Sequence, residues 1–181
     1  MRKKYYFAYG ADLNIPQMLD CCPRAQIVGW AEIPGHDLLF RGTKQRCGLT
    51  IEPGAGIVYV GVWQLTAEDE YTLGRRVGRE LYQAKEIELD VHLVPGEVPP
   101  AATSYCSWRT VRCSTQQTNA WQEVKRLKGT ILTAAPGNPP ELPESTHCQS
   151  IARGFAAFGF PLENLTEAWA RSLRYRTRGE E

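Results

Sequence analysis

The chain has 181 residues, 43% of them hydrophobic, which predicts one globular domain and excludes a disordered or fibrous chain. The 21 Lys and Arg residues almost balance the 20 Asp and Glu residues, so the formal net charge is +1. This balance gives no electrostatic reason to expect nucleic acid or an anionic membrane as a partner. No stretch approaches the roughly 20 apolar residues of a membrane span. The N-terminus lacks the continuous apolar segment of a signal peptide, which favours a cytoplasmic location and reduced thiols.

The six cysteines are scattered along the chain without a CxxC pair. Only Cys148 has a histidine beside it, namely His147. Buried free thiols are therefore predicted, and neither a metal site nor a cofactor is expected.

The N-terminal region predicts a strand, a tight loop and a short helix. Residues 5–9 are aromatic and apolar and stop at Gly10, as in a buried first strand that runs into a turn. A helix is predicted over 16–22, with Asn14 placed to cap it.

Two clusters of turn-forming residues, Pro34-Gly35 and 53–56, predict two hairpins. The first hairpin would join strands 26–33 and 37–40, and the second would join strands 49–52 and 57–65.

Beyond the hairpins the pattern alternates between helices and strands. Thr66, followed by three acids, predicts a helix that ends near Arg76, and strict alternation over 81–94 predicts a half-buried strand. Further predicted elements are a strand over 101–113, helices over 121–132, 147–158 and 165–173, and a loop over 135–143. Short strands with helices gathered near the C-terminus predict an α+β fold, in which a mostly antiparallel, closed sheet (a barrel) is packed against helices in one domain, 1–181.

Three groups of motifs follow one another in a fixed order. They are Y-F-A-Y-G-A-D-L at 6–13; G-H-D-L-L-F, T-I-E-P and G-V-W-Q-L-T between 35 and 66; and I-A-R-G-F-A-A-F-G-F-P at 151–161. In these motifs the chain resembles the γ-glutamylcyclotransferase family. The resemblance covers most of the chain except about 113–144, for which an insertion is predicted.

The resemblance implies that the α-amine of a γ-glutamyl compound attacks its own γ-carbonyl, which gives 5-oxoproline and releases an amine. This chemistry needs an anchor for the α-carboxylate and a group that accepts a proton. A strand that turns into a helix exposes backbone N–H groups, which suit such an anchor. The predicted substrate-binding residues are Tyr9, Gly10, Ala11, Asp12, Leu13, Tyr82 and His147.

The sequence departs from the family where the acid/base is expected. Val77 stands at the position of the family's glutamate, and valine cannot exchange a proton. Glu80 is the predicted catalytic residue in its place, although it could instead be a surface glutamate paired with a neighbouring arginine. Asp12, which replaces an asparagine in the binding loop, is a second candidate base, but its charge would oppose an anion if it pointed inward. His147 suits proton transfer near neutral pH, or else simply caps a helix.

Three functions remain open from the sequence. One is a cyclotransferase with a relocated acid/base, and another is an inactive relative that binds a small carboxylate or amino-acid-like ligand. The third is a scaffold whose Arg75, Arg76 and Arg79 recognise a larger acidic ligand or a protein. The oligomeric state does not follow from the sequence.

Overall fold

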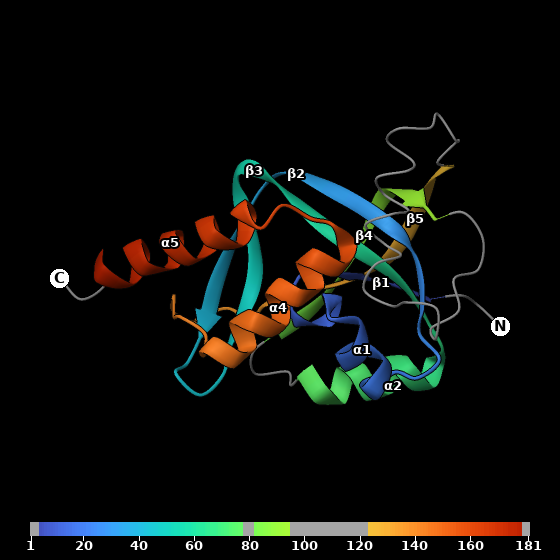
Figure 1. The fold of residues 1–181 in the computed structure, drawn as a ribbon, viewed down its shortest axis with the longest axis horizontal. Helices are drawn as coiled ribbons and strands as arrows, with labels where there is room; N and C mark the ends of the chain where they lie inside the picture. The colour runs from blue at the N-terminus through green and yellow to red at the C-terminus, as the bar shows by residue number, and fades with distance from the viewer. Residues whose placement is uncertain (1–3, 78–81, 95–122, 179–181) are drawn as a thin grey trace.

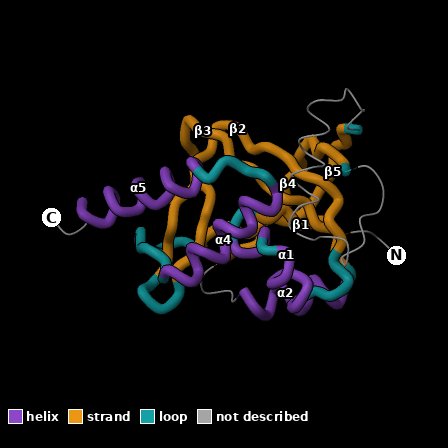
Figure 2. Tube along the Cα trace, in the orientation of Figure 1, coloured by secondary structure: helices purple, strands orange, loops and turns teal. Residues whose placement is uncertain are grey.

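The computed structural model describes residues 4–77, 82–94 and 123–178. Its strands form a closed barrel in the order β1-β3-β2-β4-β5, with helices packed outside (Figures 1 and 2), which confirms the predicted α+β architecture. The strands are β1 (Lys4–Ala8), β2 (Gln26–Gly42), β3 (Cys47–Leu65), β4 (Tyr82–Leu93) and β5 (Val124–Ala134). The helices are the 3-10 turn η1 (Ala11–Leu13), α1 (Ile15–Cys21), α2 (Ala67–Val77), α4 (Ser145–Phe158) and α5 (Glu163–Arg178). All the pairings are antiparallel except the short parallel contact between β1 and β5 that closes the barrel.

The prediction of two hairpins over 26–65 is wrong, because β2 and β3 are two long strands that pair with each other. Their connecting turn lies at 43–46, where Thr43 and Arg46 exchange backbone hydrogen bonds of 2.9 and 3.1 Å. The two clusters of turn formers face each other across the ladder, where the register shifts between Pro34 and His36. Proline and glycine there produce a bulge, because a bulge tolerates the missing N–H and the positive φ that a regular ladder excludes.

The predicted helix over 121–132 is also wrong, since 124–134 form β5. Its buried residues have a period of two and are Leu127, Gly129, Ile131 and Thr133. A Cβ atom on Gly129 would lie 2.7 Å from the carbonyl oxygen of Tyr5, so a glycine lets β1 approach closely. The same apolar residues also match helical spacing, and in a segment this short spacing alone does not separate the two structures.

β5 lies inside the range 113–144, for which an insertion is predicted. Residues 124–134 are thus part of the barrel, and an insertion within that range stays a prediction. The predicted strand over 101–113 lies outside the described residues.

The helix ends follow the sequence closely. The side chain of Asn14 accepts a hydrogen bond from the Gln17 N–H at 3.4 Å at the start of α1, as predicted. At the start of α2, the Thr66 hydroxyl accepts from the Asp69 N–H at 3.2 Å, and the Asp69 carboxylate accepts from Thr66 in return. α4 ends at Gly159, whose φ of 65° is left-handed, as a helix C-terminus commonly requires.

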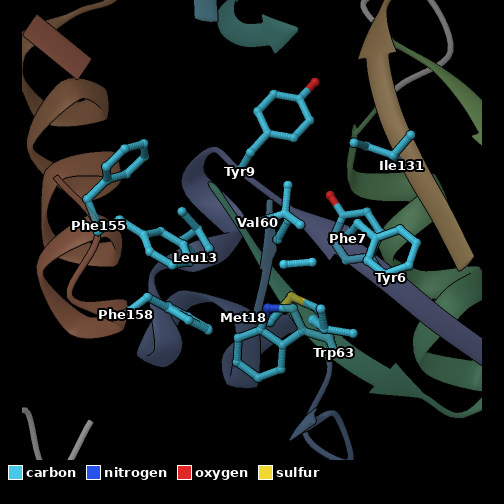
Figure 3. Close-up of a cluster of buried hydrophobic side chains, with 14 of the residues drawn as sticks. Tyr6, Phe7, Tyr9, Leu13, Met18, Val60, Trp63, Ile131, Phe155 and Phe158 are labelled. Carbon is cyan, nitrogen blue, oxygen red and sulfur yellow. The ribbon is translucent and has the colours of Figure 1, made fainter. Parts of the chain in front are cut away.

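The core joins the barrel to α4 and fixes the loop that follows β1. Figure 3 shows Phe155 and Phe158 of α4 pointing toward Leu13 of η1. A Cβ atom on Gly154 would lie 2.5 Å from the Cβ of Leu13, so α4 packs directly against η1. Burying each large apolar side chain stabilises the fold by about 1.5–3 kcal/mol, which holds the loop in one position.

Candidate functional site

A pocket of about 220 Å³ lies where β1 passes into η1. It is bounded by residues from β1, η1, α1, β3, α2, β4, β5 and α4. The lining residues are Tyr6, Tyr9, Gly10, Ala11, Asp12, Gln17, Leu49, Arg76, Tyr82, Leu132 and His147. Six of the seven predicted substrate-binding residues therefore meet in one cavity. Leu13 does not line it, because its side chain is fully buried in the core.

The floor of the pocket is the turn that the sequence motif predicts. Hydrogen bonds of 3.0 Å from Leu13 N–H to the Gly10 carbonyl and from Asn14 N–H to the Ala11 carbonyl close this turn. Ala11 and Asp12 are the first residues of η1, and the first N–H groups of a helix have no partner within it. These two amides suit a carboxylate oxygen.

Asp12 lines the pocket, and its charge is compensated. Its carboxylate accepts a hydrogen bond of 2.6 Å from the Tyr6 hydroxyl through Oδ2 and is ion-paired with Arg76 through Oδ1. The residue is only 8% exposed. Burial disfavours the charged guanidinium, yet the Asp12 carboxylate and neighbouring groups raise the pKa of Arg76 overall. The guanidinium therefore keeps its charge, which offsets the repulsion that the Asp12 carboxylate alone would exert on an anionic ligand.

His147 lies in the first turn of α4 and faces the same pocket. Ser150, one helical turn later, receives a hydrogen bond of 3.0 Å from the Asn14 amide and donates one of 2.6 Å to Gln17. These bonds tie α4 to α1 and thereby place His147. Burial lowers the pKa of His147, and the charges of Asp12 and Glu144 offset this only in part. The imidazole is therefore neutral at pH 7 and can accept a proton.

Three tyrosines supply hydroxyl groups that stay protonated. Burial, with the nearby Asp12 carboxylate, raises the pKa of Tyr6 and of Tyr82, and burial likewise raises the pKa of Tyr9. The Tyr9 hydroxyl donates to the Leu132 carbonyl, and that of Tyr82 donates to the Leu49 carbonyl at 3.4 Å. These phenols are hydrogen-bond donors at neutral pH and not bases.

The remaining predictions concern the residues at and after the C-terminal end of α2. Glu80 and Arg79 lie outside the described residues, so a catalytic Glu80 stays a prediction. Val77 is the last residue of α2. Arg75 lies over the ring of Tyr71, 5.9 Å from its centroid, whereas Arg76 reaches Asp12, so these two arginines do not form one anion-binding cluster.

Sequence reasoning missed four lining residues: Tyr6, Gln17, Leu49 and Leu132. Leu132 was hidden by the wrong prediction of a helix over 121–132. Arg76 was expected beside the pocket as part of an arginine cluster, whereas the structure pairs it with Asp12.

Within the described ranges, no group of three or more His, Cys, Asp or Glu side chains is placed to hold a metal ion. No helix in these ranges is long and apolar enough to cross a membrane. The four cysteines in them are free thiols.

Comparison with solved structures shows that the chain has the fold of γ-glutamyl cyclotransferases, as its motifs predict. A structure described as a gamma-glutamyl cyclotransferase is 18% identical with a TM-score of 0.60, over 92% of this chain and 86% of that one. An uncharacterized protein from Homo sapiens is 17% identical with a TM-score of 0.61, over 93% and 87% of the two chains. YkqA from Bacillus subtilis is 12% identical with a TM-score of 0.64; the match covers 95% of this chain but 55% of YkqA. No family model and no curated protein matches the sequence.

Proposed function

We propose that the protein binds a small γ-glutamyl compound in this pocket and cyclises it to 5-oxoproline, with His147 as the proton acceptor. One observation carries the proposal: His147, whose pKa is lowered by burial, lines the same cavity as Ala11 and Asp12, the first residues of η1. The cavity thus combines an anchor for a carboxylate with a base, the two requirements of the reaction.

Binding would begin at the turn after β1. The ligand's α-carboxylate would accept hydrogen bonds from the N–H groups of Ala11 and Asp12 at the start of η1. Because Arg76 neutralises Asp12, the cavity presents no net negative charge to that carboxylate. Leu49 and Leu132 offer apolar surface for the methylene groups of the glutamyl chain.

The proposed cyclisation uses neutral His147 as the proton acceptor. His147 would take a proton from the ligand's α-ammonium, and the freed amine would attack the γ-carbonyl carbon and form the ring C–N bond. Attack would leave a second proton on the ring nitrogen. As the tetrahedral intermediate collapses, protonated His147 would give its proton to the leaving amine, the bond to that amine would break, and the ring nitrogen would pass its second proton to the imidazole. A tyrosine hydroxyl is a suitable donor to the developing oxyanion.

Among the described residues lining the pocket, His147 is the best-suited base. Both oxygens of Asp12 are already engaged by donors, Tyr6 and Arg76. Arginine remains protonated, and the phenols hold their protons because burial raises the pKa of all three tyrosines.

Binding without turnover is the second candidate. It is favoured by Val77 at the glutamate position, because the usual acid/base is missing there. In this case the same anchor would hold an amino-acid-like ligand, and His147 would contribute only a hydrogen bond.

The test is incubation with a panel of γ-glutamyl amines and dipeptides, with 5-oxoproline quantified by mass spectrometry and affinity measured by calorimetry. Product formation that depends on His147 supports the first candidate. Saturable binding without product supports the second. If no γ-glutamyl compound binds or reacts, the first candidate is wrong; if free amino acids do not bind in the same calorimetry either, the second is wrong too.

A further inference from the structure

Gly48, near the start of β3, lies against the side chain of Tyr82. A Cβ atom built on Gly48 would lie 1.5 Å from the phenolic oxygen of Tyr82 and 2.7 Å from its Cζ. The backbone itself does not require glycine here, because Gly48 is absent from the glycines with positive φ in the described part of the chain. The phenol of Tyr82 is therefore what excludes a larger residue at position 48.

This contact decides where the tyrosine ring lies. Tyr82 is the first residue of β4, and its side chain reaches β3, where the hydroxyl donates to the Leu49 carbonyl. Tyr82 and Leu49 both line the pocket. At 3.4 Å their hydrogen bond is long, so the hydroxyl can exchange it for a bond to a ligand at little cost.

We infer that Gly48 is a positioning residue for the pocket: its missing side chain lets the Tyr82 phenol lie against β3 and form one wall of the ligand site. A neutral phenol at this wall is a donor for a carbonyl oxygen of the ligand. That Tyr82 donates to the ligand rests on the proposed function, whereas the placement of Tyr82 by Gly48 does not.

Gly48→Ala tests the placement without any ligand. The new methyl group would meet the far end of a side chain, so we expect the fold to persist and the ring to move outward. Burial raises the pKa of Tyr82, and a displaced phenol should ionise near the ordinary value of about 10. The alkaline absorbance titration of Gly48→Ala should therefore show about one more tyrosinate per chain near that pH than the wild type.

Two variants serve as controls for this titration. Gly48→Ala/Tyr82→Phe should lose the additional tyrosinate. Gly74→Ala should titrate like the wild type, because a Cβ atom there meets nothing within 4 Å. If Gly48→Ala unfolds, Gly48→Ala/Tyr82→Ala should fold again, with the Tm of Tyr82→Ala alone. A Gly48→Ala protein that titrates like the wild type, or an unfolded one that this second change does not rescue, would overturn the inference.

Calorimetry with γ-glutamylalanine tests the role toward the ligand. We expect Gly48→Ala and Tyr82→Phe each to weaken binding by about tenfold, and the double variant to bind no worse than either. Gly48 would not act through Tyr82 if Gly48→Ala bound the ligand with wild-type affinity. The same would follow if the fold-losses in affinity of the two single variants multiplied in the double variant. If the wild type binds no γ-glutamyl compound but Gly48→Ala shows the additional tyrosinate, the proposed function and the role toward the ligand fail, and the positioning of Tyr82 stands.

Discussion

Arg76, in the last turn of α2, is ion-paired with Asp12 on η1, although 64 positions separate them in the sequence. This pair brings the C-terminal end of α2 into contact with the loop that would hold the ligand. It also explains how an aspartate is accommodated in a loop that is proposed to bind a carboxylate, because the guanidinium cancels its charge.

We predict that Arg76→Gln weakens the binding of a γ-glutamyl ligand by about tenfold or more, because the remaining Asp12 charge would repel its carboxylate. The change should also cost about 1 kcal/mol of stability, since Asp12 then keeps only its bond to Tyr6. Calorimetry and urea unfolding measure the two effects.

Asp12→Asn/Arg76→Gln is the matched control for that experiment. It removes both charges, so it should recover most of the affinity that Arg76→Gln loses. If the double variant binds as weakly as the single one, Arg76 contacts the ligand itself and does not act through Asp12.

The stability of the protein should depend on pH through His147. Its pKa in the folded state is lowered, so the unfolded chain binds more protons in the window between the folded pKa and the usual value of 6.5. The free energy of unfolding should therefore fall as the pH drops from about 6.5 through the folded pKa. His147→Gln should flatten this part of the profile, as measured by urea unfolding across the window. An unchanged slope would mean that His147 is not buried as described.

Two helical glycines should respond oppositely to the same substitution. Gly74→Ala on α2 should stabilise the protein by about 0.5–1 kcal/mol, because alanine favours the helix and its methyl group meets nothing within 4 Å. Gly154→Ala on α4 should destabilise it by about 1–3 kcal/mol, because its Cβ atom would lie 2.5 Å from that of Leu13. Because α4 also carries His147, this second change should lower ligand affinity as well. Chemical denaturation measures the change in the free energy of unfolding for each variant. If both substitutions changed it equally, the close packing of α4 on η1 would be contradicted.

The sequence predicted the first strand, the helix caps and the binding turn because their signals are local. Asn14, the Thr66–Asp69 pair and Gly159 each determine a helix end by hydrogen bonds or φ within a few residues. The β2–β3 pairing could not be predicted in the same way. Its turn formers occupy a bulge rather than a hairpin, and only the partner strand decides between the two.

The candidate site was predicted only in part for the same reason. The motif around Gly10 identified the turn, and single residues such as Tyr82 and His147 followed from the family resemblance. The Asp12–Arg76 pair and the contact of Gly48 with Tyr82 join distant segments, and no local pattern encodes such contacts.

The cyclisation proposed for this pocket depends on His147 as its base. Its most direct test is the rate of 5-oxoproline formation by the wild type and by His147→Gln, measured across pH with the best substrate of the panel. We predict that the wild-type rate falls as the pH drops below a midpoint lower than 6.5, because the imidazole must be neutral. His147→Gln should be slower by a factor of about 10²–10⁴ and lack this midpoint. If His147→Gln forms product at the wild-type rate, His147 is not the base.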